Sequence, residues 1–420
     1  MKTKFAFGIL VIFFAVIAAM AHKSSAIPAN VYPKANVVLI VVDCLRKDHL
    51  GSYGYPLPAT PVLDAFARSS FVYDRAYSQA GWTVPSIASI LTSLYPHQHQ
   101  TIQPDTKLPE GLLTIAETLR ASGYATGAVV SHMFLSPSYE LNRGFDTYDT
   151  SVFSLKRNPH LIASAHDVTA RAVDFIASTK TPFFLWLHYF DPHADYLDLP
   201  PSYFGKEPIN FYDREIANTD AAIGGFLRQL TARGLLDTTI VMIMADHGEE
   251  FRDHRAVSHE SYFEEVLAIP LLLRLPGGSS RLISAGYVEQ IDVAPTLLRL
   301  VGTEPPSQFA GVSFFPDDPN KSVAYMQRPA FGNRIQRAAI YDGQMKLVVI
   351  DEKIGRRWDL FDLAVDPFEQ KNLARLQPED VKRLEQRLEQ HLKEQHLIGR
   401  ATIELEPEDE DVLRAMGYVE

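Results

Sequence analysis

The sequence predicts an α/β protein with a mostly parallel sheet and helices on both faces, followed by a small C-terminal antiparallel subdomain. Short apolar runs rich in β-branched residues alternate with amphipathic segments of helical length, which is typical of a parallel sheet. Near the C-terminal end, an Asp-Gly pair separates two β-rich runs, which indicates a hairpin. The chain has 420 residues, of which 46% are hydrophobic and 22% charged, so it can bury a large core.

The N-terminal segment predicts export. Lys2 and Lys4 precede an apolar run from Phe5 to Ala21, and small residues follow, as in a secretory signal peptide. We assign residues 1–26 to this signal and expect an exported protein, located in the periplasm or outside the cell. The alternative is an uncleaved membrane anchor, for which this run is at the short limit.

Charge and cysteine content narrow the class of protein further. Cys44 is the single cysteine, so no disulfide can form within the chain even after export. The net charge of −11, without a basic run, argues against a general nucleic-acid binder.

The elements of the main domain follow in chain order. Three apolar runs predict buried strands at residues 36–42, 181–188 and 239–244. Three amphipathic segments predict helices at residues 112–122, 163–178 and 212–233. We assign residues 35–330 to the domain built on this sheet.

Residues 331–420 form the predicted C-terminal subdomain. Asp342-Gly343 lies between two β-rich runs and predicts a hairpin. A polar, Glu-rich segment at about residues 378–394 predicts a closing helix. We expect this subdomain to pack against the main sheet.

Residues suited to metal binding follow the predicted strands. Asp43 comes directly after the first strand, and Asp246-His247 follows the third. Ligands of open parallel sheets bind beyond the carboxyl ends of the strands. Two carboxylates and an imidazole there make a plausible divalent-metal site, although an aspartate at such a position can instead cap the next helix.

Thr83 opens a predicted helix in the stretch GWTVPSIAS, with Pro85 two residues later. Capping is the usual role of such a threonine. The alternative is a nucleophile, because a metal can lower the pKa of a bound water from about 15.7 to about 7 and could activate a hydroxyl in a comparable way. We favour the nucleophile, since metal-type residues are at hand, but the two roles are not exclusive.

Several motifs together resemble the sulfatase family, within the alkaline phosphatase superfamily. The segments that carry the resemblance are NVVLIVVDCLRKDHLGSYGY (36–55), GWTVPSIASILTSLYPHQH (81–99), FDPH (190–193), ADHGE (245–249), LFDLAVDP (360–367) and LRAMGY (413–418). The resemblance implies an alkaline-phosphatase-like, mostly parallel sheet and a sulfatase-like catalytic domain over residues 35–330. It also implies a metal-dependent hydrolase that acts on ester bonds.

The same resemblance implies roles for individual residues. The divalent metal ion would be held by Asp43, Thr83, Asp246 and His247. Thr83 would occupy the nucleophile position, while His193 and His259 would face the anionic group or the leaving oxygen of the substrate. A solvated loop histidine is the alternative for His193 and for His259.

Two departures from the family pattern change the expected chemistry. Formylglycine is made from Cys or Ser in a C/S-x-P-x-R pattern, but this chain has Thr83-Val84-Pro85-Ser86-Ile87, so formylglycine should not form. Cys44 stands where many sulfatases have another metal-binding carboxylate, which favours Mn²⁺ or Zn²⁺ and leaves Ca²⁺ as a further candidate. Cys44 itself is either a soft ligand or a small core residue.

These observations predict an exported metallohydrolase that cleaves a phosphate-type or sulfate ester through a metal-activated Thr83. The phosphate-type ester is favoured because the Asp/Thr/Asp/His set is similar to that of envelope phosphotransferases and partly to phosphonate monoester hydrolases. The expected substrate is a small-molecule, glycan or lipid ester, and membrane contact is expected only through an uncleaved N-terminal segment. The alternatives are an envelope phosphotransferase and a non-catalytic binding protein on the same scaffold.

Overall fold

The computed structural model describes residues 31–153, 164–180, 182–193, 196–201, 204–255, 257–259, 261–316, 319–328, 336–352, 355–393 and 399–403. The predicted signal at residues 1–26 and the family-like motif at residues 413–418 lie outside this part of the chain. Within it, no helix combines the length and the apolar character needed to cross a membrane.

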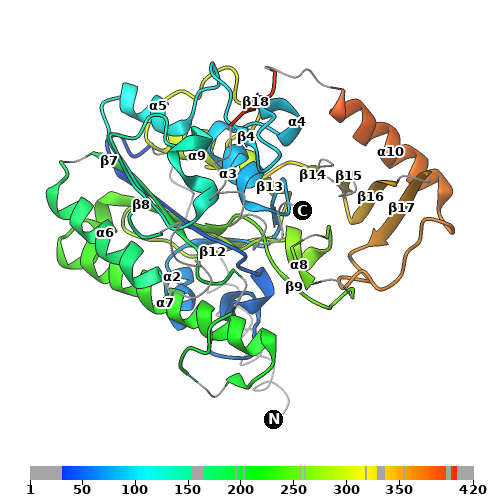
Figure 1. Ribbon diagram of the computed structural model, residues 1–420, viewed down its shortest axis with the longest axis horizontal. Helices are drawn as coiled ribbons and strands as arrows, with labels where there is room; N and C mark the ends of the chain where they lie inside the picture. The colour runs from blue at the N-terminus through cyan, green and yellow to red at the C-terminus, as the bar shows by residue number, and fades with distance from the viewer. Residues whose placement is uncertain are drawn as a thin grey trace, which may run out of the picture. The chain divides into compact units, whose positions relative to one another are not determined.

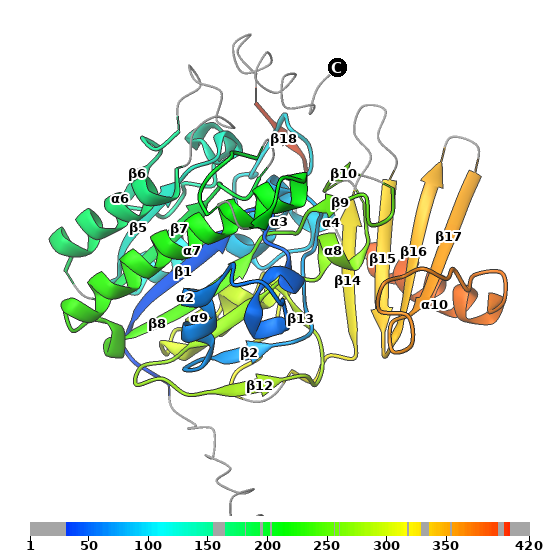
Figure 2. The ribbon, with the colours of Figure 1, turned by 90° about the horizontal axis from the view of Figure 1, so that it is seen from below.

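The main sheet of the described residues has eight strands in the order β12-β2-β11-β8-β1-β7-β5-β6 (Figures 1 and 2). The strands are β1 (Asn36–Val42), β2 (Phe71–Tyr73), β5 (Ala125–Val130), β6 (Thr147–Asp149), β7 (Phe183–Tyr189), β8 (Thr239–Ala245), β11 (Leu271–Arg274) and β12 (Arg281–Ile283). All neighbours pair in parallel except β11, which runs antiparallel to β8 and to β2. The predicted mostly parallel sheet is confirmed.

Helices cover both faces of this sheet (Figures 1 and 2). One face carries α2 (Pro61–Ala67), α6 (Ala165–Ser178) and α7 (Pro208–Ala232), and the other carries α3 (Thr83–Thr92), α5 (Ile115–Ala121) and α9 (Val293–Leu300). Every residue of the central strands β1, β7 and β8 is buried between these layers, which explains why their sequences are mostly apolar. Close packing is clearest at Gly127 of β5, where a Cβ atom would lie 2.2 Å from the Phe175 ring of α6.

The register of the central strands determines where their loops emerge. Val42, the last residue of β1, pairs with Tyr189 of β7 on one side and with Ala245 of β8 on the other. The next residues of all three strands therefore leave the sheet at one edge, as expected for a ligand site of a parallel sheet.

The C-terminal sheet is antiparallel and consists of β14 (Val323–Arg328), β15 (Gln336–Asp342), β16 (Met345–Glu352) and β17 (Gly355–Asp362). The predicted hairpin at Asp342-Gly343 joins β15 to β16, and the predicted closing helix is α10 (Pro378–Leu392). Alternate residues of the sheet face opposite sides. Ile340 and Leu347 pack with α10, whereas Tyr341 and Val348 pack with residues of the main domain. The first strand of this sheet, β14, lies before residue 331, where the C-terminal subdomain is predicted to begin.

Short elements complete the described fold. They are β3 (Ala76–Tyr77), β4 (Thr106–Lys107), β9 (Glu250–Phe251), β10 (Val257–Ser258), β13 (Val288–Glu289), β18 (Ala401–Thr402), α4 (Pro96–His99) and α8 (Glu264–Leu267).

A buried lysine joins the C-terminal sheet to the main domain. Lys346 of β16 has no exposed side-chain surface, and its Nζ lies 3.0 Å from Glu264 Oε1 and 2.7 Å from Glu369 Oε1. Glu264 belongs to α8, which follows the loop after β8. The backbone N–H of Glu264 also donates to Glu369 Oε2 at 2.7 Å, so one network holds both parts together.

Glu215 of α7 should make stability depend on pH. Glu215 is 2% exposed, and burial raises the pKa of its carboxyl group to about 9. Because the unfolded carboxyl ionises near its ordinary pKa of 4.5, the stability that protonated Glu215 confers is complete below about pH 4.5 and is lost as pH rises toward 9. Glu215→Gln should therefore raise the free energy of unfolding by about 3 kcal/mol at pH 7 and hardly at pH 4.5. Urea unfolding at both pH values measures this, and equal gains at both would contradict the assignment.

Candidate active site and metal-binding centre

The ends of two neighbouring parallel strands bring two carboxylates and an imidazole together. Asp43 follows β1, while Asp246 and His247 follow β8, and the register of these strands places them side by side. His247 Nε2 lies 3.6 Å from Asp43 Oδ1 and 3.5 Å from Asp246 Oδ2, and none of the three side chains is exposed. The structure thus assembles these three residues of the predicted metal site.

The donor atoms of this group fit a divalent metal ion. Among the described residues, Asp43 Oδ1, Asp246 Oδ2 and His247 Nε2 have no hydrogen-bond partner, and ligand atoms of the three residues lie within 4.8 Å of one another. Burial, together with the charge of Asp246, raises the pKa of Asp43 well above its usual range, and burial also raises the pKa of Asp246. Two buried carboxylates resist joint ionisation unless a cation joins them. His247 Nδ1 lies 2.9 Å from the Gly248 carbonyl oxygen, the second contact that typically orients a metal-binding histidine.

Thr83 is not the helix cap. Trp82 is the N-cap residue of α3, and Thr83 is the first residue of the helix itself. The Thr83 hydroxyl is buried and donates to Asp43 Oδ2 at 3.5 Å instead. The capping alternative is therefore wrong, and the hydroxyl points at the metal-type carboxylates. The N-terminus of α3 lies at the same place and favours an anionic ligand.

Hydrogen bonds hold the loop before Thr83 against the end of β8. Ser78 Oγ and Gln290 Nε2 each donate to the Asp246 carbonyl oxygen at 2.6 Å. Ser78 Oγ also lies 3.1 Å from Ser86 Oγ of α3, so these contacts link the start of the helix to the end of β8. At Gly81, a Cβ atom would lie 3.0 Å from Val266 Cγ1 and 3.1 Å from the His259 carbonyl oxygen. The loop therefore passes too close to the His259 segment for a side chain to fit easily.

The two predicted substrate-facing histidines lie beside this centre. The rings of His193 and His259 are 5.3 Å apart, and the His259 ring is 4.6 Å from the His247 ring. Ligand atoms of His193, Asp43 and Cys44 lie within 4.8 Å of one another. Both histidines are buried at 6% and 4% exposure, so neither is the solvated loop residue of the alternative.

Cys44 faces the centre, and the protein groups around it favour the neutral thiol. Its Sγ lies 3.8 Å from His247 Nδ1 and 3.9 Å from His259 Nδ1. Burial and the nearby carboxylates, with Glu249 first among them, raise the pKa of the thiol well above its usual range. Cys44 has a φ of 56°, a left-handed conformation that is uncommon outside glycine. The Tyr212 hydroxyl supports this turn by donating to the Cys44 carbonyl oxygen at 2.7 Å.

Two residues near the centre were not predicted from the sequence. His188 of β7 lies with Nε2 at 3.7 Å from Asp43 Oδ2, and burial together with His247 lowers its pKa to about 3, so it is neutral. Glu249 is fully buried, its Oε1 lies 3.9 Å from His259 Nδ1, and burial raises its pKa to about 7. A polar residue inside the apolar run of β7 was the available signal for His188.

Asp191, by contrast, makes contacts that stabilise the fold. Its carboxylate accepts hydrogen bonds from the Ser164 N–H and hydroxyl at 2.7 Å and from the Ala165 N–H at 3.0 Å. These groups lie at the N-terminus of α6, so Asp191 caps that helix from the strand end. Its position explains part of the FDPH motif without a role at the metal centre.

Comparison with known proteins identifies the family. A model described as "Sulfatase" matches residues 35–303, well over half of the chain, and a model described as "N-sulphoglucosamine sulphohydrolase, C-terminal" matches residues 251–397.

Individual relatives are more distant. The chain is 27% identical over 281 residues to arylsulfatase K of Bos taurus, covering 62% of this chain and 49% of the relative. It is 27% identical over 326 residues to an ulvan-active sulfatase of Formosa agariphila, covering 66% of this chain and 64% of the relative. The match thus spans about half the length of the arylsulfatase K relative.

Solved structures share the fold at low sequence identity. The structure of BT4656 in complex with its substrate D-glucosamine-2-N,6-O-disulfate is 19% identical, covers 86% of this chain and 98% of that chain, and has a TM-score of 0.73. The crystal structure of Ps i-CgsB in complex with k-i-k-neocarrahexaose is 20% identical, covers 91% and 98% of the two chains, and has a TM-score of 0.73. With the matched family model covering the strands, α3 and the strand-end residues described above, the chain belongs to the sulfatase family.

Proposed function

We propose that this chain is a metal-dependent hydrolase of ester bonds in which Thr83 is the nucleophile, with a phosphate-type ester as the favoured substrate. The observation that carries the proposal is the contact of the buried Thr83 hydroxyl with Asp43, inside a group of buried metal-type donors. A hydroxyl placed for capping would have no reason to face these carboxylates.

Asp43, Thr83, Asp246 and His247 would hold a divalent metal ion, with Mn²⁺ or Zn²⁺ favoured and Ca²⁺ a further candidate. The mixture of carboxylate and imidazole donors, with a cysteine in place of another carboxylate, supports the softer ions. When bound, such an ion would lower the pKa of the Thr83 hydroxyl and offset the negative charge of the substrate.

The residues then suggest a double displacement. The Thr83 oxygen attacks phosphorus, its proton passes to Asp43, and the ester oxygen leaves with a proton from His259 or His193. This step leaves a phosphorylated Thr83. Water then attacks the same phosphorus, a proton of that water returns to the histidine, and Thr83 leaves with the proton held by Asp43. Acid–base help of this kind typically contributes about 10²–10⁴-fold to the rate.

A sulfate ester is the second candidate, because the matched relatives are described as sulfatases. The same two steps would pass through a sulfated Thr83. Threonine lacks the geminal hydroxyl with which formylglycine expels sulfate by elimination, so water must displace the sulfate from Thr83. The phosphate-type ester is favoured for this reason. Names of the relatives suggest that a small molecule or a glycan carries the ester.

The test compares an aryl phosphodiester and an aryl sulfate with the full chain and Mn²⁺ or Zn²⁺. We expect phosphodiester hydrolysis to exceed sulfate hydrolysis, with product formed in water alone. Sulfate hydrolysis in excess would overturn the phosphorus preference, and the absence of turnover on both esters with metal bound would overturn the hydrolase proposal.

We also propose that the chain is exported, from the signal-like pattern at residues 1–26. Fractionation of cells that express the full chain should recover it in the periplasm or the medium, and a purely cytosolic product would refute export.

A further inference from the structure

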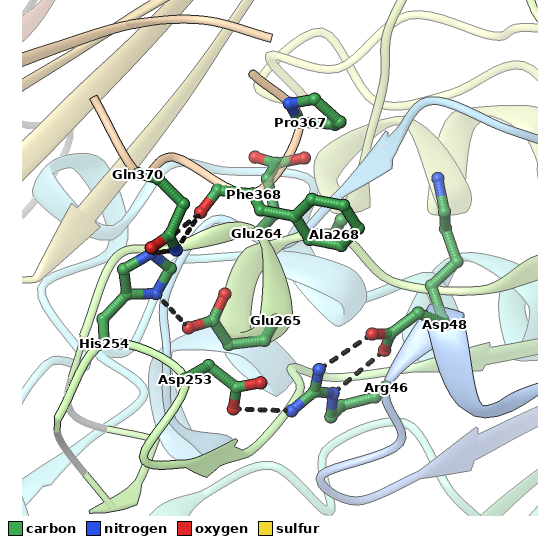
Figure 3. A pocket seen from close by; sticks show the side chains of 11 residues that line it. Arg46, Asp48, Asp253, His254, Glu264, Glu265, Ala268, Pro367, Phe368 and Gln370 are labelled. Carbon is green, nitrogen blue, oxygen red and sulfur yellow. Dashed lines mark hydrogen bonds and ion pairs between the residues drawn. The ribbon is translucent and has the colours of Figure 1, made fainter. Parts of the chain in front are cut away.

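A second cluster of metal-type side chains lies beyond the candidate metal centre and shares no residue with it. Glu250 belongs to β9, His254 to the turn that follows β9, and Glu265 to α8. One ligand atom of each residue lies within 4.8 Å of the others. His254 and Glu265 also line a pocket of about 620 Å³, in which Figure 3 shows them facing each other.

The imidazole of His254 is held in one orientation. Its ring stacks on Phe263, with centroids 3.5 Å apart and an angle of 14° between the planes. His254 Nε2 lies 2.9 Å from the Phe368 carbonyl oxygen and 3.2 Å from Gln370 Nε2. The carbonyl oxygen can accept only an N–H, so the shorter contact places the proton on Nε2. In a neutral ring this leaves the lone pair on Nδ1, which lies 2.6 Å from Glu265 Oε1. A carbonyl partner on one nitrogen is the usual arrangement for a histidine that binds metal through the other.

The environment of Glu250 points to a ligand. Glu250 is 1% exposed, and neither of its carboxylate oxygens has a hydrogen-bond partner in the part of the chain that the structure describes. The Ser261 hydroxyl lies near enough to oppose the rise in the pKa of Glu250, but it makes no hydrogen bond of normal geometry to either oxygen. Burial raises the pKa of Glu250 to about 7. A carboxylate this deeply buried ordinarily has a cationic or hydrogen-bonded partner.

Arg46 lines the same pocket, but its guanidinium is already paired with other carboxylates. Arg46 donates to both carboxylate oxygens of Asp48 at 2.9 and 2.8 Å and to Asp253 Oδ2 at 3.0 Å (Figure 3). The imidazole of His254 lies close to both Glu250 and Glu265 and contacts Glu265 directly. Even if His254 is protonated, the cluster keeps an excess of carboxylates.

We propose that Glu250, His254 and Glu265 form a second binding site for a divalent transition metal ion, with Zn²⁺ as the best fit. Two carboxylates and one imidazole make a set of three protein ligands, and the adjoining pocket gives access to water for a further position. This site does not depend on the chemistry proposed for Thr83.

A metal ion at this second site would stabilise the loop after β8, which carries residues of the candidate active site. The backbone N–H groups of Gly248 and Glu249 donate to the carbonyl oxygens of Val266 and Glu265 at 2.8 and 3.1 Å. The loop after β8 and α8 are thus already in contact, and a shared ion would cross-link the side chains of the same two segments. Zn²⁺ binding should accordingly raise the melting temperature.

The experiment measures metal content of the full chain. Protein stripped with a chelator is equilibrated with Zn²⁺, freed of excess ion and analysed by mass spectrometry of the metal. We expect about two equivalents of Zn²⁺ per chain in the unaltered protein, and a loss of one in Glu250→Gln and in His254→Ala. His166→Ala changes an exposed histidine of α6 and is the matched control, which should keep both.

Asp43→Asn separates the two sites. It should lose the ion of the candidate active site and keep the one bound by Glu250, whether or not the esterase proposal is correct. Circular dichroism establishes that each variant folds, and His254→Ala serves if Glu250→Gln does not. Zn²⁺ content that is unchanged in both Glu250→Gln and His254→Ala would overturn the second site, as would a single equivalent that only Asp43→Asn removes.

Discussion

Thr83→Ala should lower kcat/KM for the preferred ester by at least about 10⁴-fold, because removal of a nucleophile leaves only the positioning and electrostatic parts of catalysis. Metal content should stay near that of the unaltered protein, since Asp43, Asp246 and His247 remain. The loss should appear in kcat more than in KM. Steady-state kinetics together with metal analysis check both statements.

Two controls sharpen this test. Thr83→Ser keeps a hydroxyl and should retain measurable turnover, while Thr92→Ala makes the same change at the other end of α3 and should leave kcat unchanged. Acid-quenched protein should carry a phosphoryl group on Thr83, detected by peptide mass spectrometry. Full activity of Thr83→Ala would exclude the nucleophile and return the role of this residue to positioning.

Lys346→Met should reduce the free energy of unfolding by about 3–5 kcal/mol, since it leaves the buried Glu369 and the partly buried Glu264 without their cation. The ion pairs with Glu264 and Glu369 span 3.0 and 2.7 Å around a side chain with no exposed surface. Urea unfolding at pH 7 measures the change.

The triple variant Lys346→Met, Glu264→Gln and Glu369→Gln is the matched comparison for that loss. It removes the charges together, and replacement of a whole buried ion pair is often close to neutral. We therefore expect it to be more stable than Lys346→Met alone. A single variant less than about 1 kcal/mol below the unaltered protein would show that the network is solvated and contributes little.

The strands and the strand-end residues could be predicted because composition alone distinguishes a fully buried strand. β1 occupies the predicted residues 36–42, and Asp43 and Asp246 lie together because both follow parallel strands in register. The capping alternative for Thr83 could not be decided in this way. Whether Trp82 or Thr83 is the N-cap depends on one backbone conformation that tertiary contacts fix.

Other parts of the site depend on contacts that the sequence does not encode locally. His188 reaches Asp43 only because β7 lies next to β1, although the two strands are far apart in the chain. Likewise, the left-handed turn at Cys44 is supported by Tyr212 of α7. Such residues become visible once strand order is known, which periodicity does not determine.

The two consecutive glutamates of α8 limit which segments of the chain can be exchanged with those of another sulfatase. Glu264 faces Lys346 of the C-terminal sheet, while Glu265 faces His254 of the loop after β8. A chimaera that took only its C-terminal sheet from another sulfatase would leave one of these glutamates without its partner, even if the two chains were joined without distortion near residue 331. The matched C-terminal family model begins at residue 251, within β9, so it also includes α8. A transfer of the C-terminal sheet that keeps both contacts of α8 should therefore begin no later than β9 and carry α8 and the sheet together.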